Sequence, residues 1–446
     1  MRGKNFSIGL RALAIFAVTL LVTSTWAATN WNEKVRLNFN GSDGASPQAG
    51  LISDAAGNLY GTTSYGGEYN AGMVFELTPT MGGGWTEQVL HTFGNGTDGV
   101  NPIAGLIFDA AGNLYGTTDA GGAYNHGTVF ELTPTGGGWT EQVLHSFNNN
   151  GTDGVWLFAG LTFDAAGNLY GTTQGGGTYG YGTLFELTPT AGGGWMETVL
   201  VNFNGTDGAY PSAGLIFDTV GNLYGTTYFG GTYGYGTVFQ LTPTVGGGWA
   251  EEVLHSFNGT DGARPDLADL IFDAAGNLYG TTSGGGNYSN CTYGCGTVFE
   301  LTPTAGGGWT EQVLYSFSNN GTDGAYPGAG LIFDAAGNLY GTTSEGGAYN
   351  DAGTVFELTR TAGGGWTEQV LYSFSNNGTD GANPSAGVIF DAAGNLYGTT
   401  PGGGTYGYGT VFELTPIYPC AKCSHSVLRE VHGFPAENRD ALEQRR

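Results

Sequence analysis

One short segment, Gly-Asn-Leu-Tyr-Gly-Thr-Thr, occurs seven times in this chain of 446 residues. Its copies are spaced 54 to 61 residues apart and begin at Gly57, Gly112, Gly167, Gly221, Gly276, Gly337 and Gly394. Three further signatures recur with the same count: Phe-(Glu/Gln)-Leu, Trp-x-Glu, and a turn that ends in Asp-Gly. A period of this length indicates an array of equivalent supersecondary units. The length of the chain is therefore no guide to its number of domains.

Each unit predicts four short strands. In the second unit these are expected at residues 105–108, 114–118, 128–133 and 139–147, all rich in β-branched or aromatic residues. A turn that begins at Asp109 separates the first two strands, and Pro134 with the glycines that follow it is expected to end the third. No segment carries a sustained helical period of apolar residues. The chain is therefore expected to be all-β.

Four-stranded units repeated four to eight times are typical of a β-propeller, while the alternative, a β-solenoid, usually has shorter coils. The array begins with a strand of the fourth type at residues 31–39, and its last unit ends after a strand of the third type at residues 410–415. The N-terminal strand is thus expected to supply the outer strand of the last blade, which closes the ring and removes open edges. We predict one seven-bladed β-propeller with four strands per blade over residues 30–416.

The two ends of the chain differ from the array. Arg2, Lys4 and Arg11 precede an apolar run at residues 12–22 and small residues near Ala27, the pattern of a signal peptide over residues 1–28. The run is short for a membrane span, although an N-terminal anchor helix is an alternative. Residues 417–446 form a polar tail. We expect a secreted or extracytoplasmic protein that has no membrane span after signal removal.

Composition supports a folded, glycine-rich and acidic protein. Glycine supplies 85 residues, about 19% of the chain against roughly 7% in average proteins. With 13% aromatic and only 11% charged residues, the chain resembles neither a disordered chain nor collagen. Residues 30–416 hold 34 acidic and four basic side chains, a net charge of −30. That charge excludes nucleic acids and anionic membranes as partners and suits divalent cations or cationic partners.

The pair of motifs Gly-Asn-Leu-Tyr-Gly-Thr-Thr and Gly-Thr-Val-Phe-Glu-Leu-Thr resembles the GloVer tandem repeats of exported bacterial proteins, which carry varied C-terminal anchors. The resemblance covers nearly the whole chain after residue 28. It implies export and a repeat fold, and it implies no reaction. This sequence departs from the anchored members, because residues 417–446 show no hydrophobic segment or sorting signal.

Strand alternation places the loops after the second and the fourth strand of every unit on one face. The residues that recur there are the candidates for ligand binding, because tyrosine can stack on sugar rings while carboxylates accept sugar hydroxyls or coordinate Ca²⁺. Loop residues present in few copies, such as Tyr228 and Glu345, are also of interest, and His126 is a candidate of this kind. The alternative is that the tyrosines pack on the next blade and the aspartates only form turns. The recurring candidates are Tyr69, Tyr124, Tyr179, Tyr233, Tyr288, Tyr349, Tyr406, Asp98, Asp153, Asp207, Asp261, Asp323 and Asp380.

Three histidines, His91, His145 and His255, share one position of the fourth strand. Other units place Leu37, Val201, Tyr315 or Tyr372 there, which favours a packed strand position over a metal or catalytic role.

The four cysteines form two close pairs. Cys291 and Cys295 in a lengthened loop predict a disulfide. Cys420 and Cys423, near two histidines of the tail, are candidates for a disulfide, with free thiols or a zinc site as alternatives.

The leading hypothesis is a monomeric binding module for an extracellular carbohydrate or protein ligand, with Ca²⁺ as the only cofactor that the carboxylates suggest. The first alternative is a glycan hydrolase or lyase, and the second is a passive envelope or matrix protein. An enzyme should gather a few unrepeated polar residues in one pocket, with perturbed carboxylate pKa values. A binding module should instead show shallow sites repeated around the ring.

Overall fold

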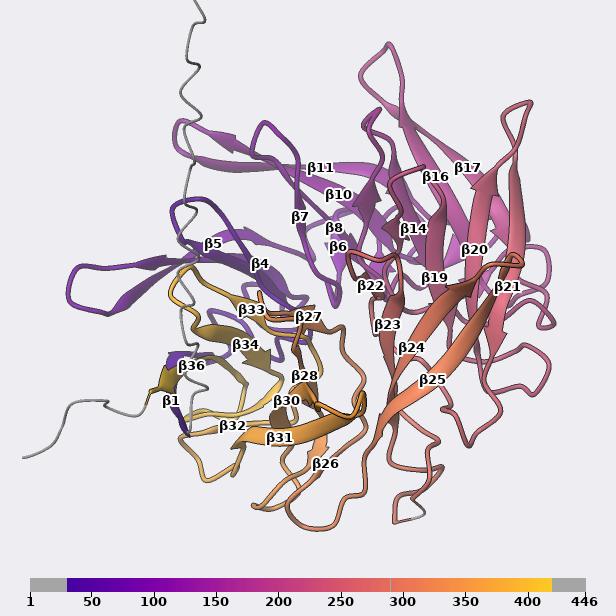
Figure 1. Cartoon of the computed structure of the whole chain (residues 1–446). Helices are drawn as coiled ribbons and strands as arrows, with labels where there is room; N and C mark the ends of the chain where they lie inside the picture. Colours follow the sequence, from indigo (N-terminus) through magenta and orange to yellow (C-terminus); the bar gives the residue numbers. More distant parts are fainter. Residues whose placement is uncertain (1–29, 289, 419–446) are drawn as a thin grey trace, which may run out of the picture. The chain divides into compact units, whose positions relative to one another are not determined.

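The computed structural model describes residues 30–288 and 290–418, and every regular element in these ranges is a β-strand (Figure 1). Seven four-stranded antiparallel sheets form the seven blades of a propeller, in agreement with the predicted fold class. Blade 2 shows the common order, in which each strand pairs with its neighbours along the chain. Its strands are β7 (Ile107–Phe108), β8 (Leu114–Thr118), β10 (Thr128–Thr135) and β11 (Gly138–Ser146).

The other blades repeat this pattern with the following bounds. Blade 1 holds β2 (Ile52–Ser53), β3 (Leu59–Thr63), β4 (Met73–Pro79) and β5 (Trp85–Thr92). Blade 3 holds β13 (Thr162–Phe163), β14 (Leu169–Thr173), β16 (Thr183–Pro189) and β17 (Trp195–Asn202). Blade 4 holds β18 (Ile216–Phe217), β19 (Leu223–Thr227), β20 (Thr237–Pro243) and β21 (Trp249–Ser256). Blade 5 holds β22 (Ile271–Phe272), β23 (Leu278–Thr282), β24 (Thr297–Thr304) and β25 (Gly308–Ser316). Blade 6 holds β27 (Ile332–Phe333), β28 (Leu339–Thr343), β30 (Thr354–Arg360) and β31 (Trp366–Ser373).

Blade 7 is completed by the first strand of the chain. Its order is β33 (Ile389–Phe390), β34 (Leu396–Thr400), β36 (Thr410–Ile417) and β1 (Asn30–Asn38). The predicted closure of the ring by the N-terminal strand is therefore confirmed. One apolar cluster extends across the closure, because Phe39 and Phe75 pack in it together with Tyr397 and Val411.

Several strand boundaries of the second unit differ from those predicted, and the first and third strands differ most. The first strand is two residues long rather than four, and the backbone that precedes it bonds to the preceding blade: Thr117 Oγ1 donates to the carbonyl of Ala159 at 3.0 Å. Pro134 does not end the third strand, which runs to Thr135. The proline is tolerated because β8 pairs only as far as Leu132, so the missing N–H faces no partner strand there.

The core lies between the blades. Each of its seven clusters combines apolar side chains from two successive sheets, as when Tyr115, Phe147 and Phe185 pack together between blades 2 and 3. The glycine of the repeated motif is required by this packing. A Cβ atom on Gly116 would lie 2.6 Å from Cζ of Phe130 and 2.9 Å from Cδ2 of Leu106.

The two ends of the blades are built differently. The turns between the first and second and between the third and fourth strands form what we call the turn face. In blade 2, Asp109 accepts the backbone N–H groups of Ala111 and Asn113 at 2.8 Å and the Asn113 side chain at 2.8 Å. Tyr115 OH donates to Glu131 at 2.8 Å and lies 3.3 Å from Asp109. Burial raises the pKa of the Tyr115 hydroxyl, so it stays a donor.

The remaining loops form the loop face. The loop after the fourth strand pairs with the loop after the second strand of the next blade, which confirms that both lie on one face. Four of these pairs are short ladders, and the other three are single bridges, Ala45 with Tyr65, Ala209 with Phe229 and Ala263 with Gly284. The ladders are β6 (Gly99–Val100) with β9 (Ala120–Gly121), β12 (Gly154–Val155) with β15 (Gly175–Gly176), β26 (Gly324–Ala325) with β29 (Glu345–Gly346), and β32 (Gly381–Ala382) with β35 (Gly402–Gly403).

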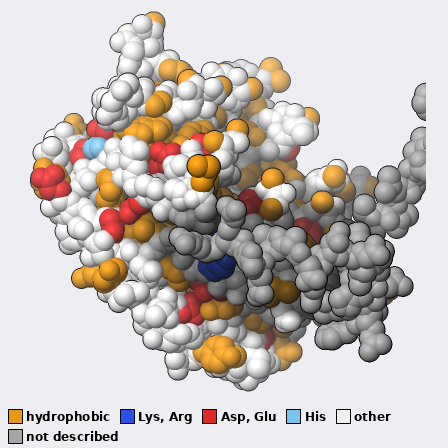
Figure 2. Space-filling model, turned by 90° about the vertical axis from the view of Figure 1, so that its left-hand side faces the viewer, with side chains coloured by type: hydrophobic (Ala, Val, Ile, Leu, Met, Phe, Trp, Pro, Cys, Tyr) orange, Lys and Arg blue, Asp and Glu red, His pale blue; other side chains and the backbone are white. Residues whose placement is uncertain are grey.

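Residues Trp31–Pro416 form one compact unit. No helix in the described ranges is long and apolar enough to cross a membrane. The face shown in Figure 2 carries acidic side chains dispersed among uncharged ones rather than gathered in one patch. The expected signal peptide at residues 1–28 and the cysteines Cys420 and Cys423 lie outside the described residues.

Candidate functional site

The seven recurring tyrosines are all solvent-exposed on the loop face. Their exposed fractions range from 46% for Tyr69 to 60% for Tyr406, and none is buried against a neighbouring blade. The rings are therefore accessible to a ligand, one on each blade. The other members of the set are Tyr124, Tyr179, Tyr233, Tyr288 and Tyr349.

The recurring aspartates are placed differently, since their oxygens order their own loops. Asp153 accepts the N–H of Asn148 at 2.8 Å and that of Gly154 at 2.7 Å. Equivalent contacts hold the buried Asp98, Asp323 and Asp380 and the half-buried Asp207 and Asp261. His126 lies with Tyr124 at a shallow hollow of about 420 Å³ that three asparagines, residues 148–150, complete.

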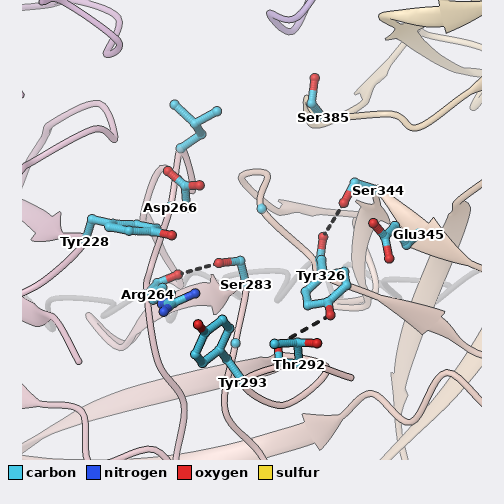
Figure 3. A pocket seen from close by; sticks show the side chains of 13 residues that line it. Tyr228, Arg264, Asp266, Ser283, Thr292, Tyr293, Tyr326, Ser344, Glu345 and Ser385 are labelled. Carbon is cyan, nitrogen blue, oxygen red and sulfur yellow. Dashed lines mark hydrogen bonds between the residues drawn. The ribbon is translucent and has the colours of Figure 1, made fainter. Parts of the chain in front are cut away.

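One hollow on the loop face is a cavity of about 370 Å³ (Figure 3). Its lining comes from blades 4 to 7 and from the loops that connect them. A neighbouring cavity of about 330 Å³ shares Tyr228, Asp266 and Leu267 with it and extends to Gln48, Ile103 and Phe158. The side chains labelled in Figure 3 are Tyr228, Arg264, Asp266, Ser283, Thr292, Tyr293, Tyr326, Ser344, Glu345 and Ser385.

Two of the lining residues, Arg264 and Tyr326, occupy one strained backbone position. The seven copies of this position have φ between +56° and +63°, a left-handed conformation that is unfavourable for side chains other than glycine and asparagine. Each copy is held by backbone contacts: the N–H of Arg264 donates to Tyr235 O at 2.7 Å, and its carbonyl accepts from Ser283 N at 3.0 Å. The copies hold five residue types, in the order Ser46, Asn101, Trp156, Tyr210, Arg264, Tyr326 and Asn383. The fold thus keeps one backbone geometry and varies the side chain that it presents.

Arg264 lies against aromatic rings. Its guanidinium carbon is 3.9 Å from the ring centroid of Tyr293, 5.5 Å from that of Phe229 and 5.8 Å from that of Tyr228. Cation–π contacts of this kind orient the guanidinium plane. Tyr293 is 66% exposed, so its ring also has a free side.

A disulfide between Cys291 and Cys295 closes the loop that carries Tyr293. The same loop contacts the next blade, because Tyr326 OH donates to Thr292 O at 3.4 Å. One wall of the cavity is thus cross-linked and anchored.

Two carboxyl groups face the cavity from opposite sides in Figure 3. Burial raises the pKa of Asp266, which accepts a hydrogen bond from Ser212 Oγ at 3.1 Å. Burial, followed by the charge of Asp351, raises the pKa of Glu345. Neither carboxyl belongs to the sevenfold set, so their positions are specific to blades 5 and 6.

Blade 5 departs from the other blades in its backbone as well. Its entry segment reads Pro-Asp-Leu-Ala-Asp from Pro265, whereas blade 4 has Pro-Ser-Ala-Gly from Pro211. Because blade 5 has one more residue in this segment, Thr226 Oγ1 lacks the carbonyl acceptor that the equivalent threonines of the other blades have. The added Asp269 accepts the N–H of Gly214 at 2.6 Å.

Arg264, Asp266, Tyr293 and Tyr326 were not among the predicted site residues. The signals that pointed to them were present in the sequence: one extra residue before the fifth copy, a lengthened loop with two cysteines, and a rare arginine. What the sequence did not reveal is that these departures lie beside one another in space.

A model of the Gloeobacter/Verrucomicrobia repeat family matches residues 20–221, 190–292 and 287–439. No curated protein matches this chain. Among solved structures, a proposed oxidoreductase (glucose dehydrogenase) from Thermus thermophilus is 16% identical with a TM-score of 0.40, over 86% of this chain and 100% of that one. PorZ, a surface component of the type-IX secretion system of Porphyromonas gingivalis, is 15% identical with a TM-score of 0.39, over 78% of this chain and 48% of PorZ. Such distant likenesses say nothing about ligand or chemistry.

Proposed function

We propose that this chain, which belongs to the Gloeobacter/Verrucomicrobia repeat family, is a binding module whose loop face takes a carbohydrate in the cavity beside Arg264. The observation that carries the proposal is the lining of that cavity. Tyr228, Tyr293 and Tyr326 offer aromatic surface, and Ser283, Thr292 and Ser344 add polar groups. Sugar rings have apolar faces that stack on aromatic side chains and hydroxyls that need polar partners.

The size and rigidity of the cavity support this choice. About 370 Å³ lies within the usual range of small-molecule sites. The disulfide at Cys291, the backbone contacts of Arg264 and the hydrogen bond of Tyr326 all restrict the lining before any ligand arrives. A site ordered in advance loses less entropy on binding.

The proposed export of the chain determines the compartment in which it meets its ligand. We propose that residues 1–28 are removed as a signal peptide and that the ring, residues 30–416, acts outside the cytoplasm as a monomer with the tail at residues 417–446. Intact-mass measurement of the protein recovered from outside the cytoplasm would test the cleavage near Ala27.

A glycan array probed with the purified chain, with and without Ca²⁺, is the direct test of the proposal. For any glycan that binds, Tyr293→Ala and Arg264→Ala should each weaken affinity about five- to thirtyfold, because stacking contacts of this kind contribute on the order of 1–2 kcal/mol. Tyr124→Ala is the matched control, since it removes a similarly exposed loop tyrosine from another blade. Equal loss in all three variants, or no glycan bound across a broad array, would contradict the proposal.

A second candidate is a glycan hydrolase or lyase in the same cavity. Two unrepeated carboxyls, Asp266 and Glu345, favour it, because burial raises the pKa of each and a raised pKa suits a carboxyl to act as a general acid. Product analysis on any bound glycan distinguishes the candidates. Turnover that is abolished by Asp266→Asn while binding persists would establish the enzyme, whereas an unchanged glycan would favour the binding module.

A further inference from the structure

Each joint between two blades contains a pair of carboxyl groups. The glutamate that follows the repeated tryptophan in one blade faces the aspartate in the loop of the preceding blade; Glu197 and Asp153 form such a pair. In all seven joints of the described ring, the glutamate Oε1 atom is buried and has no hydrogen-bond partner. The seven glutamates are Glu33, Glu87, Glu141, Glu197, Glu251, Glu311 and Glu368.

The third side chain at the joint varies from blade to blade. Tyr315 and Tyr372 donate their hydroxyls to Asp323 and Asp380 at 3.2 and 3.1 Å. Leu37 and Val201 occupy the same strand position and offer no polar atom. The three histidines bring an imidazole nitrogen to the two carboxylates, so only these joints can combine nitrogen and oxygen ligands.

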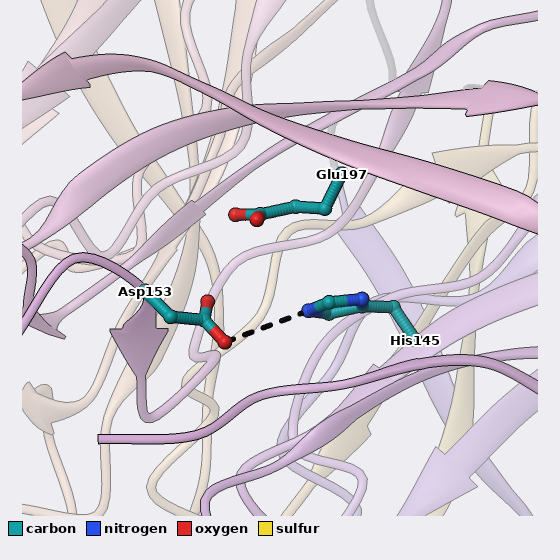
Figure 4. A group of neighbouring side chains, drawn as sticks. All are labelled: His145, Asp153 and Glu197. Atoms are coloured by element: carbon teal, nitrogen blue, oxygen red, sulfur yellow. Dashed lines mark ion pairs between the residues drawn. The ribbon is translucent and has the colours of Figure 1, made fainter. Parts of the chain in front are cut away.

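Two of the histidine joints have the geometry of a metal site. In the first, one ligand atom from each of His145, Asp153 and Glu197 lies within 4.8 Å of the others (Figure 4). His255, Asp261 and Glu311 form the second group with the same criterion. The histidine Nε2 and aspartate Oδ2 atoms are 3.7 Å apart in the first group and 3.3 Å in the second. Tetrahedral Zn²⁺ with bonds of about 2.1 Å needs ligand atoms about 3.4 Å apart.

In each of these two groups, the histidine Nε2 atom and the glutamate Oε1 atom have no hydrogen-bond partner within the described chain, although Nε2 lies at ion-pair distance from the aspartate. Nε2 of His145 and Oε1 of Glu197 are buried without a hydrogen-bond partner, and the same holds for His255 and Glu311. Buried polar atoms without partners are costly, and a bound cation would satisfy both of them at once. The third histidine differs in two ways: His91 Nε2 forms a hydrogen bond with Asp98 Oδ2 at 3.2 Å, and this joint does not meet the 4.8 Å criterion for three ligand atoms.

We propose that His145 with Asp153 and Glu197, and His255 with Asp261 and Glu311, are two inter-blade binding sites for Zn²⁺. Each site takes histidine and aspartate from one blade and glutamate from the next, so the ion joins blade 2 to blade 3 and blade 4 to blade 5. The joint at His91 is not a third site, because its three candidate ligand atoms do not all lie within 4.8 Å of one another.

The ligand types select the ion. Imidazole nitrogen together with carboxylate oxygen suits Zn²⁺, whereas Ca²⁺ takes oxygen ligands only. Two carboxylates and a neutral imidazole also balance the charge of a divalent ion. Because the donor atoms are buried, the ion would join the blades rather than meet a substrate.

The surroundings hold the ligands in place. The Asp153 carboxylate is fixed by Asn148 N and Gly154 N, and the His145 ring packs edge to face on Phe147 with centroids 4.5 Å apart. His255 contacts Phe257 in the same way, with centroids 4.8 Å apart. Orientation of this kind strengthens metal binding in known sites.

The test is titration of the untagged, metal-stripped full chain with ZnCl₂ in a calorimeter. The parent protein for this titration has the substitutions Cys420→Ser and Cys423→Ser, so that tail thiols cannot bind the ion. We expect two ions per chain, one in His145→Val or His255→Val, and none in the double variant. Valine is the residue that blade 3 has at this position, so these variants should fold. The control His91→Val should keep both ions.

A thermal melt of the same variants gives a second readout. Zn²⁺ should raise the melting temperature of the parent, raise it less in each single variant and leave the double variant unchanged, because an ion bound only to the folded state stabilises it. The proposal is overturned if the parent binds no Zn²⁺ at 0.1 mM, or if the double variant still binds two ions. It is also overturned if Ca²⁺ competes equally for the sites.

Discussion

The seven units differ little in the blade bodies and on the turn face. On the loop face they differ much more. In the bodies, all seven units retain the same aspartate–asparagine–tyrosine turn, here Asp109, Asn113 and Tyr115. On the loop face, one shared backbone conformation carries five residue types, among them Trp156 and Arg264. The comparison separates residues that build a blade from residues that the blades are free to vary. Function is expected among the latter, and four predictions test that separation.

The largest effect is expected in a blade body. Gly116→Ala should destabilise the ring by about 3 kcal/mol, because the added Cβ would overlap Phe130 and Leu106. Gly136→Ala is the control, since a Cβ there meets no atom within 4 Å. Thermal melts of both variants measure the difference. Equal melting temperatures would show that the body tolerates change as well as the loops do.

The turn face should come next. Asp109→Ala removes the acceptor of two backbone N–H groups and of the Asn113 side chain. A loss of about 2 kcal/mol is expected, since those donors become unsatisfied. Chemical denaturation provides the measurement, and ligand binding at the loop face should be unaffected. A variant as stable as the parent would mean that the turn sequence is retained for another reason.

The joints between bodies should make stability depend on pH. Burial, followed by the charge of Asp43, raises the pKa of Glu87 to about 8. In the unfolded chain this carboxyl ionises near its ordinary pKa of 4.5. The stability that the Glu87 carboxyl contributes to the folded ring is therefore complete below pH 4.5 and is lost as the pH rises through 8. Each such glutamate should contribute about 1 kcal/mol after allowance for partial solvation.

The melting temperature should accordingly fall between about pH 5 and about pH 8.5. Glu87→Gln mimics the protonated form, so it should match the parent at the lower pH and exceed it at the higher one. A melting temperature that rises over this range would contradict the assignment of these carboxyls.

The smallest effect is expected on the loop face, and it has the opposite sign. Trp156 has φ of +63°, so Trp156→Gly should stabilise the ring by about 0.5 kcal/mol once the greater freedom of glycine in the unfolded chain is allowed for. Trp156→Ala keeps the strained backbone and should be less stable than the glycine variant by about 1 kcal/mol. Denaturation of the pair measures the strain directly, and a more stable alanine variant would refute it.

Sequence alone specified the repeated part of the molecule. The spacing of the motif predicted seven blades, and the mismatch between the chain ends predicted that β1 would pair with β36. Strand lengths were less accurate: the first strand is shorter than predicted, and the segment before it contacts the preceding blade, as in the hydrogen bond of Thr117 to Ala159. A local sequence pattern holds no information about such a contact between blades.

The candidate site was predictable only in part. The exposed tyrosines were anticipated on the correct face, including Tyr124. The contact of Arg264 with Tyr293 was not, because it depends on a loop geometry found only in blade 5. The grouping of His145 with Glu197 was also missed, since the two residues lie on adjacent blades and histidine looked interchangeable with valine at that position. The repeats reveal the blade structure that all units share. The residues that depart from the repeat can be interpreted only once the fold shows which of them lie close together.

The pairing of β1 with β36 also has an evolutionary consequence. The two closing strands stand at the two ends of the array, and every internal unit begins and ends at the same point of a blade. Recombination between repeats can therefore add or remove a whole unit without touching the closing pair. The number of blades can then change without loss of the strand pairing that closes the ring.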